Sequence, residues 1–99
     1  MIINEAKYCH IVTEVHPNGS YLFIYWYTEP PYWLKKELET EKTNKDLLQN
    51  VIKKPFIEIL DGCCRVRGKD INGVDIDLIS FSFKVYKNLI IIKQLKKGE

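Results

Sequence analysis

A seven-residue segment of this sequence, Tyr21 to Tyr27 (YLFIYWY), would form a β-strand with no polar face. Successive side chains of a strand point to opposite faces, and both alternating sets here are apolar or aromatic. Such strands are usually central in a sheet, or covered on both faces by other elements. The segment therefore predicts a central strand that needs a cover on each side.

The residues before this segment predict a β-hairpin. Residues 16–20 read HPNGS, with a proline that presets the turn and a glycine that tolerates a left-handed backbone. A three-residue loop would pair His16 with Ser20. A two-residue Asn18-Gly19 loop would shift every cross-strand pair by one residue.

Residues 32–54 (YWLKKELETEKTNKDLLQNVIKK) predict helical structure between Pro30-Pro31 and Pro55. The stretch from Glu39 to Asp46 is wholly polar, so two short helices or one kinked helix are expected. Thr43 with Asp46 resembles a capping box that would open the second helix. An apolar stripe at helical spacing is formed by Leu47, Leu48, Val51 and Ile52.

The chain after Phe56 predicts four antiparallel strands, joined by turns at Asp61-Gly62, Asn72-Gly73 and Lys87-Asn88. Two-residue loops at all three turns gather one apolar set on a single face. This set is Ile57, Ile59, Cys64, Val66, Ile79, Phe81, Phe83, Val85, Ile90 and Ile92. The opposite face would carry Glu58, Arg65, Arg67, Ser80, Ser82, Lys84 and Lys93. Because Val74 and Ile76 have the wrong parity, we expect a bulge or a sheet-leaving flap near Leu78.

These elements predict one α+β domain over residues 1–99, long enough for a single core. The fold class we expect is an antiparallel sheet, made of the N-terminal hairpin and the four-stranded C-terminal meander, packed on one or two short helices. The helix with the Leu47–Ile52 stripe would cover the apolar face. The arrangement could be a new fold.

The tyrosine-rich side of the hairpin is the first candidate functional surface. Its alternating residues would form a partner interface, namely Tyr21, Phe23, Tyr25 and Tyr27. A second copy of the chain could cover it in a symmetric dimer, since aromatic residues are frequent at interfaces. Alternatively, residues 30–33 fold back over it.

A basic sheet face is the second candidate, formed by Arg65, Arg67, Lys84 and Lys93. These side chains could contact nucleic-acid phosphates. Sheets that bind nucleic acids usually add exposed stacking aromatic residues, whereas this predicted face offers serines. Glu58 would lie opposite Arg65 as an ion pair. The net charge of +2 gives no polyelectrolyte signal, and a solvated face is the simpler interpretation.

Patterns for catalysis or metal binding are weak. His10, Glu14 and His16 share one face of the first strand, but alternate residues lie about 7 Å apart, so the two histidines are too distant to share one ion. Residues 70–77 (DINGVDID) resemble a calcium loop, but the glycine is fourth instead of sixth, so a hairpin turn with solvated aspartates is expected. Asp75 and Asp77 share a face, as many alternating carboxylates do. We expect no enzyme activity, cofactor or metal.

The chain has three cysteines, Cys9, Cys63 and Cys64, and this odd count argues against a secreted disulfide framework. Neighbours in a strand point to opposite faces, so Cys63 and Cys64 cannot pair. A Cys9–Cys64 bridge would fit a hyperthermophilic archaeal source, and buried free thiols are the simpler interpretation. The first residues do not have the pattern of a signal peptide, and no apolar run is long enough for a membrane span, so we expect an intracellular protein.

The stretches YLFIYWY and NLIIIKQLKKGE, with a bias towards isoleucine, lysine, glutamate and tyrosine, resemble small orphan proteins of filamentous and rod-shaped double-stranded DNA viruses of hyperthermophilic archaea. Short bacteriophage proteins from AT-rich genomes look similar. The resemblance implies a thermostable viral protein of no assigned activity in the host cytoplasm. We therefore expect a non-enzymatic accessory protein that binds itself, as a homodimer, or another protein through the tyrosine-rich hairpin. The alternative is nucleic-acid binding.

Overall fold

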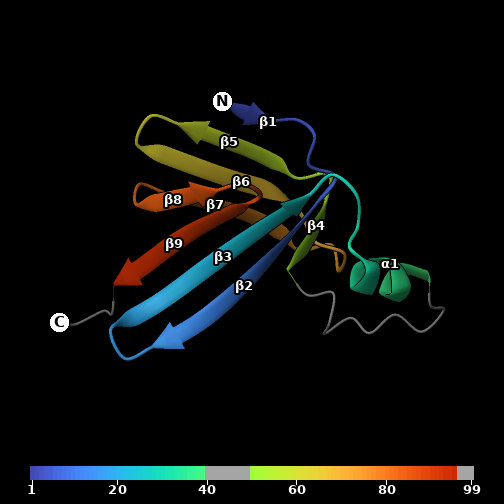
Figure 1. Cartoon of the computed structure of the whole chain (residues 1–99), viewed down its shortest axis with the longest axis horizontal. Helices are drawn as coiled ribbons and strands as arrows, with labels where there is room; N and C mark the ends of the chain where they lie inside the picture. The colour runs from blue at the N-terminus through green and yellow to red at the C-terminus, as the bar shows by residue number, and fades with distance from the viewer. Residues whose placement is uncertain (40–49, 96–99) are drawn as a thin grey trace.

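A computed structural model describes residues 1–39 and 50–95 (Figure 1). In these residues the chain is mostly β-structure with one short helix. The elements in chain order are β1 (Ile2–Ile3), β2 (Tyr8–His16), β3 (Gly19–Tyr27), α1 (Tyr32–Glu39), β4 (Val51–Lys53), β5 (Phe56–Leu60), β6 (Cys63–Lys69), β7 (Asp75–Ser80), β8 (Phe83–Tyr86) and β9 (Leu89–Leu95).

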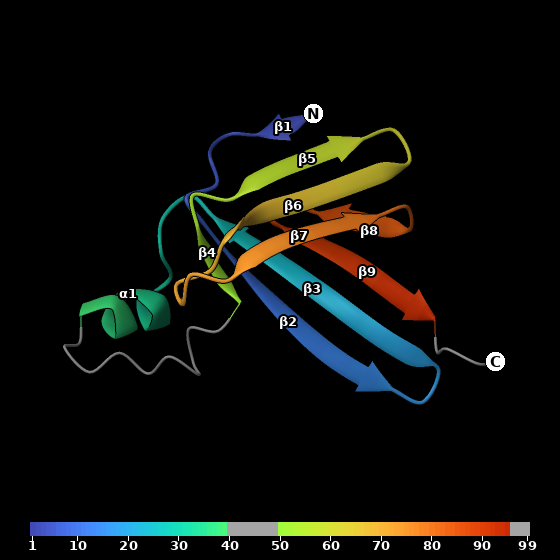
Figure 2. The same ribbon diagram turned by 180° about the vertical axis from the view of Figure 1, so that it is seen from behind.

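The strands form two antiparallel sheets. The four-stranded sheet has the order β1-β5-β6-β7, and the five-stranded sheet has the order β4-β2-β3-β9-β8. The chain crosses between the sheets at the β1–β2, β4–β5 and β7–β8 connections. Strands of one sheet run across the direction of the other, as the front and back views show (Figures 1 and 2).

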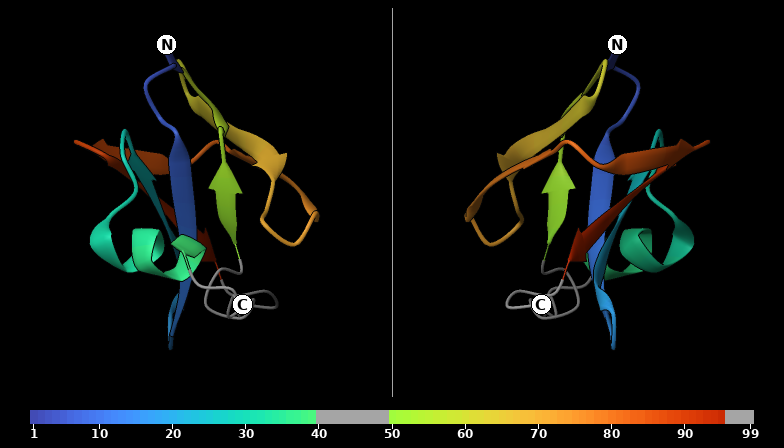
Figure 3. Two further views of the ribbon diagram at one scale, coloured as in Figure 1. Left: turned by 90° about the vertical axis from the view of Figure 1, so that its right-hand side faces the viewer. Right: turned by 90° about the vertical axis from the view of Figure 1, so that its left-hand side faces the viewer.

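One hydrophobic core lies between the two sheets (Figure 3). Alternate residues of the central strands supply it from both sides, because a strand turns every second side chain to the same face. The five-stranded sheet contributes Cys9, Ile11, Leu22, Ile24, Trp26, Ile52, Ile90 and Ile92, and the four-stranded sheet contributes Ile3, Ile57, Cys64 and Val66. The predicted antiparallel strands are confirmed, but they form two facing layers and not one sheet on a helix.

The prediction that Tyr21–Tyr27 is a central strand is confirmed, since β3 lies between β2 and β9. The three-residue loop is wrong: His16 pairs with Gly19 across the two-residue turn Pro17-Asn18. Proline at the second position and glycine at the fourth suit a type I turn, and the φ of Gly19 is +136°. Neither loop considered from the sequence had this register.

Two of the three C-terminal turns have the predicted register. Ile59 pairs with Cys64 across Asp61-Gly62, and Val85 pairs with Ile90 across Lys87-Asn88. The continuous four-stranded meander is nevertheless wrong, because the chain leaves the four-stranded sheet after β7 and β9 pairs with β3. At this crossing Ser80 Oγ donates a hydrogen bond to the Ser82 carbonyl at 2.9 Å.

The third turn has a different register from the prediction. Val66 pairs with Leu78 and not with Ile79, because the loop after β6 contains three residues, 71–73. Ile76 and Leu78 therefore pack against the core, while Ile79 and Phe81 are 55% and 80% exposed. The shift by one residue removes the parity conflict, and β7 is regular without the expected bulge or flap at Leu78.

The predicted helix that follows Pro31 is confirmed as α1. The predicted second helix is wrong at Val51 and Ile52, which belong to β4 and are buried there. The rest of that prediction, including Leu47, Leu48 and the Thr43–Asp46 cap, lies outside the described residues. In the described part of the chain, no helix has the length and hydrophobicity needed to cross a membrane.

Candidate protein-interaction face

The outer face of the five-stranded sheet, turned away from the core, is largely apolar. Its alternating side chains come from three neighbouring strands, where Val12 of β2 pairs with Phe23 of β3, and Phe23 pairs with Ile91 of β9. We call this surface the aromatic face; its residues, all partly exposed, are Val12, Tyr21, Phe23, Tyr25, Leu89 and Ile91. The Tyr21 and Phe23 rings are stacked, with centroids 6.3 Å apart.

Helix α1 covers this side of the sheet only at the end that is farthest from the β2–β3 turn (Figure 1). Leu34 of α1 and Val51 of β4 are buried there, together with the partly buried Tyr8. The Trp33 ring lies 5.1 Å from the His10 ring, and burial lowers the pKa of His10. The alternative that residues 30–33 fold back over the tyrosines therefore applies to this end alone.

The four predicted interface residues do lie on one side of β3. Tyr27, however, lies at the end of the strand that α1 covers, and it is not part of the exposed aromatic face. It pairs with Tyr8 at the covered end, and burial raises the pKa of its hydroxyl. Tyr21, Phe23 and Tyr25 remain on the aromatic face. Sequence reasoning missed Val12, Leu89 and Ile91, whose place depends on the pairing of β3 with both β2 and β9.

Near Tyr21 the rim of the aromatic face carries aromatic and cationic groups, together with Glu14, which pairs with Tyr21 across β2 and β3. Lys93 Nζ lies 5.8 Å from the centre of the Tyr21 ring, and the His16 ring meets the same tyrosine edge-on at 5.0 Å. A groove of about 440 Å³ opens beside them, lined by Tyr21, Ser82, Phe83, Lys84, Tyr86, Ile91 and Lys93. This surface offers an apolar centre with positive charge along one border.

The predicted single basic face is wrong. Arg65 and Arg67 lie on the outer face of the four-stranded sheet, whereas Lys84 and Lys93 lie on the five-stranded sheet. The division follows from the crossing after β7. Glu58 does pair with Arg65 in register.

Arg65 forms its ion pair with Asp77 and not with Glu58. Its Nε and Nη2 atoms donate hydrogen bonds of 2.9 and 2.7 Å to the two carboxylate oxygens. These bonds hold the pKa of Asp77 below its usual value. Both side chains are exposed enough for water and salt to screen the pair.

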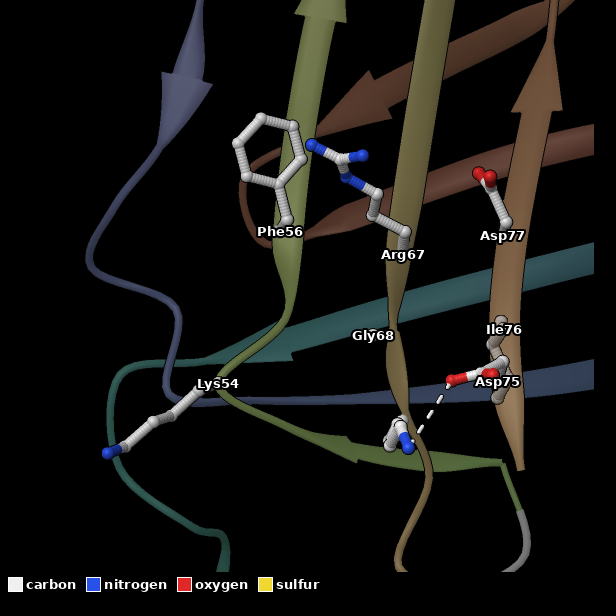
Figure 4. Close-up of a pocket in the computed structure, with 8 residues that line it drawn as sticks. Lys54, Phe56, Arg67, Gly68, Asp75, Ile76 and Asp77 are labelled. Carbon is white, nitrogen blue, oxygen red and sulfur yellow. Dashed lines mark ion pairs between the residues drawn. The ribbon is translucent and has the colours of Figure 1, made fainter. Parts of the chain in front are cut away.

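A cleft of about 410 Å³ at the end of the four-stranded sheet contains several charged groups (Figure 4). The Arg67 guanidinium lies over the Phe56 ring at 4.5 Å, and Lys69 Nζ is 4.0 Å from an Asp75 oxygen. Figure 4 shows the Lys54 side chain extending away from Arg67. Opposite charges thus compensate one another around this cleft. Its two carboxylates, Asp75 and Asp77, form ion pairs with Lys69 and Arg65.

The next motifs are the aspartate-rich loop at residues 70–77 and the three cysteines. Asp70 is buried, in contrast to the expected solvated aspartates, and its Oδ1 accepts a hydrogen bond of 2.8 Å from the Val74 amide in the hairpin loop. In residues 1–39 and 50–95, no group of three or more histidine, cysteine or carboxylate side chains could hold a metal ion. The three cysteines are free thiols, and burial raises the pKa of Cys9 to about 12, which suppresses the nucleophilic thiolate.

Comparison of the chain with models of protein families, with curated proteins and with solved structures gives no match.

Proposed function

We propose that this protein is a non-enzymatic interaction module, acting as a viral accessory protein, that self-associates through its aromatic face. The observation that carries the proposal is the contiguous apolar surface on β2, β3 and β9, which α1 leaves uncovered in the described part of the chain. Large apolar patches on a soluble domain are typical of binding sites.

The size of the sheet is compatible with a dimer interface. Strands spaced about 4.8 Å apart, with about 3.3 Å per residue, give the three strands β2, β3 and β9 a projected area of roughly 400 Å². A standard interface buries about 800 Å² of accessible surface on each partner. The accessible area of a sheet face is larger than its projected area, because side chains protrude from it. Two such faces can pack at about 10 Å, as sheets do within domains.

The test is light scattering coupled to size-exclusion chromatography, from about 1 µM to about 1 mM, which covers dissociation free energies of about 8 to about 4 kcal/mol. The wild type should become dimeric with concentration, and Phe23→Lys should remain monomeric because it places a charge at the centre of the face. Ile79→Lys makes the same kind of change at an exposed position of the four-stranded sheet and should leave the dimer intact. A wild type that is monomeric throughout would contradict self-association.

Nucleic-acid binding is the second candidate, and one observation favours it. Lys84 and Lys93 lie on the same side of the sheet as Tyr21 and Tyr86, so cations and stacking rings line one groove. A fluorescein-labelled oligothymidylate should then bind at low salt and dissociate as salt rises. Lys84→Gln with Lys93→Gln should abolish binding, whereas Lys35→Gln with Lys36→Gln on α1 should not. Absence of binding at low salt would remove this candidate.

A further inference from the structure

In residues 1–39 and 50–95, the edge of β2 has no neighbouring strand over the half that is nearest the β2–β3 turn. On that side β4 pairs with Tyr8, Cys9 and His10, and in the described part of the chain the last backbone hydrogen bond runs from the Ile11 amide to the Asn50 carbonyl at 3.1 Å. In residues 1–39 and 50–95, no strand lies beside Val12–His16 on this edge (Figures 1 and 2).

The backbone groups that face this edge follow from the alternation of hydrogen bonds along a strand. Ile11 directs its amide outward, away from β3, so Thr13 and Val15 direct their amide and carbonyl groups outward as well. Both residues are exposed, and Val15 is 82% exposed. The edge thus offers two donors and two acceptors beside a β-branched side chain.

The other sheet edges are less suited to accept a strand. β1 and β4 have two and three residues, β8 has four residues and carries Lys84, and β7 carries Asp75 and Asp77. Short length and charge are the usual protections of an edge. β2 pairs with β3 over nine consecutive residues without a bulge, and it contains neither lysine nor proline. Glu14 is the one carboxylate or ammonium group on this strand.

A second copy of the chain fits this edge poorly. Two copies could form backbone hydrogen bonds through both Thr13 and Val15 in only one antiparallel register. In that register Thr13 of one copy lies opposite Val15 of the other. Glu14 then faces Glu14 across the two-fold axis, with Cα atoms about 4.5 Å apart. Like charges directly opposite one another are destabilising. A different partner with a positive charge opposite Glu14 is favoured.

We propose that the open edge of β2 binds an extended segment of another protein by strand addition, with a lysine or arginine of that segment opposite Glu14. This inference rests on the proposed function as an interaction module and names a second contact and its chemistry. Main-chain hydrogen bonds from Thr13 and Val15 would hold the segment. The basic side chain opposite Glu14 would lie on the same side of the sheet as Val12 and the aromatic face, and its two neighbours in the segment would lie on the other side, beside Thr13 and Val15. β-branched residues are favoured in strands, so they should flank the basic one.

The experiment selects peptides from a phage-displayed library of random peptides on the immobilised full chain. The recovered peptides are then synthesised with fluorescein, and their affinities are measured by fluorescence anisotropy. Enriched peptides should carry a basic residue between β-branched residues. Val15→Pro removes one outward amide and should weaken binding by about tenfold, the worth of one hydrogen bond. An edge strand tolerates proline where the amide faces solvent.

Val85→Pro is the matched control, because the alternation places the Val85 amide on the free edge of β8; it should bind the peptides like the wild type. Glu14→Lys leaves the backbone unchanged and should shift selection to peptides with an acidic residue. Failure to enrich any peptide, or equal binding to Val15→Pro and Val85→Pro, would overturn the proposal. Phe23→Lys separates the two sites: it should remove self-association without removing peptide binding at the edge.

Discussion

Gly68 lies where β6 passes the buried side chain of Ile52 in β4. A Cβ added at this position would be 2.5 Å from Ile52 Cγ2, and the φ of Gly68 is +156°. Gly68→Ala should therefore lower the free energy of unfolding by about 1–3 kcal/mol, the usual cost of overpacking a core. Urea denaturation followed by circular dichroism measures this change.

A double-mutant cycle tests whether the contact with Ile52 causes that loss. Ile52→Leu removes the branch at Cβ while it keeps the side-chain volume, so Gly68→Ala should cost less in this background. Gly62 has a φ of +77° and no atoms within 4 Å of an added Cβ. Gly62→Ala should cost about 1–2 kcal/mol from backbone strain alone, and Ile52→Leu should not change that cost. Additive effects of Gly68→Ala and Ile52→Leu would contradict the explanation.

The buried thiol of Cys9 makes the free energy of unfolding depend on pH in the alkaline range. Burial raises its pKa from 9.0 to about 12, so the folded state holds a proton that the unfolded state releases. The contribution to stability is complete below pH 9 and is lost as pH rises towards 12. Urea denaturation under reducing conditions should show a steeper loss over this range for the wild type than for Cys9→Ala. Parallel curves above pH 9 would contradict the prediction.

At the scale of elements, the loop between β6 and β7 determines the register of the β7 edge. The Gly73 amide donates to the Asp70 carbonyl at 3.0 Å, and the Asp70 carboxylate accepts from Val74. Asp70→Ala would leave the Val74 amide without this partner and should cost about 1–3 kcal/mol. Asp70→Asn keeps an acceptor oxygen and should cost less, while exposed Asp75→Ala should stay within about 0.5 kcal/mol. Equal costs for alanine at 70 and 75 would show that this bond does not stabilise the loop.

Local patterns predicted β2, β3, β5, β6, β9 and the helix α1, but they did not predict β1, β4 or the break between β7 and β8. Long-range pairing determined what they could not. The alternation in Tyr21–Tyr27 correctly places Tyr21, Phe23 and Tyr25 on one side, because the two-residue period holds in any register. The Asn72-Gly73 pair predicts a two-residue turn, but aspartate favours the first position of a type I turn, so Asp70 begins the turn and Gly73 takes the left-handed position after it. That single residue reversed the faces of Ile79 and Leu78.

The basic candidate site failed for a similar reason at a larger distance. Turn residues specify which residues pair across Lys87-Asn88, but they do not specify that β9 joins β3. The crossing at Phe81-Ser82 therefore moved Lys84 and Lys93 to the five-stranded sheet, away from Arg65 and beside Tyr21.

For the whole molecule, the two sheets share one core and the chain passes between them three times. Neither sheet can separate without exposing buried residues of the other, such as Ile57 of β5 and Ile90 of β9, both fully buried. Small domains with a single core usually unfold in one cooperative transition. The sheets should therefore not unfold one at a time.

Native-state hydrogen exchange distinguishes cooperative from separate unfolding. Ile57→Ala creates a cavity beside the four-stranded sheet and should lower the free energy of unfolding by about 2–5 kcal/mol. In a cooperative domain the most protected amides of β3 must lose as much protection as those of β6, although β3 belongs to the other sheet. Ile90→Ala, on the five-stranded side, should produce the same equal loss. If Ile57→Ala lowered protection in β6 and left β3 unchanged, the layers would be independent units, and the aromatic face would belong to a sheet that unfolds separately from its neighbour.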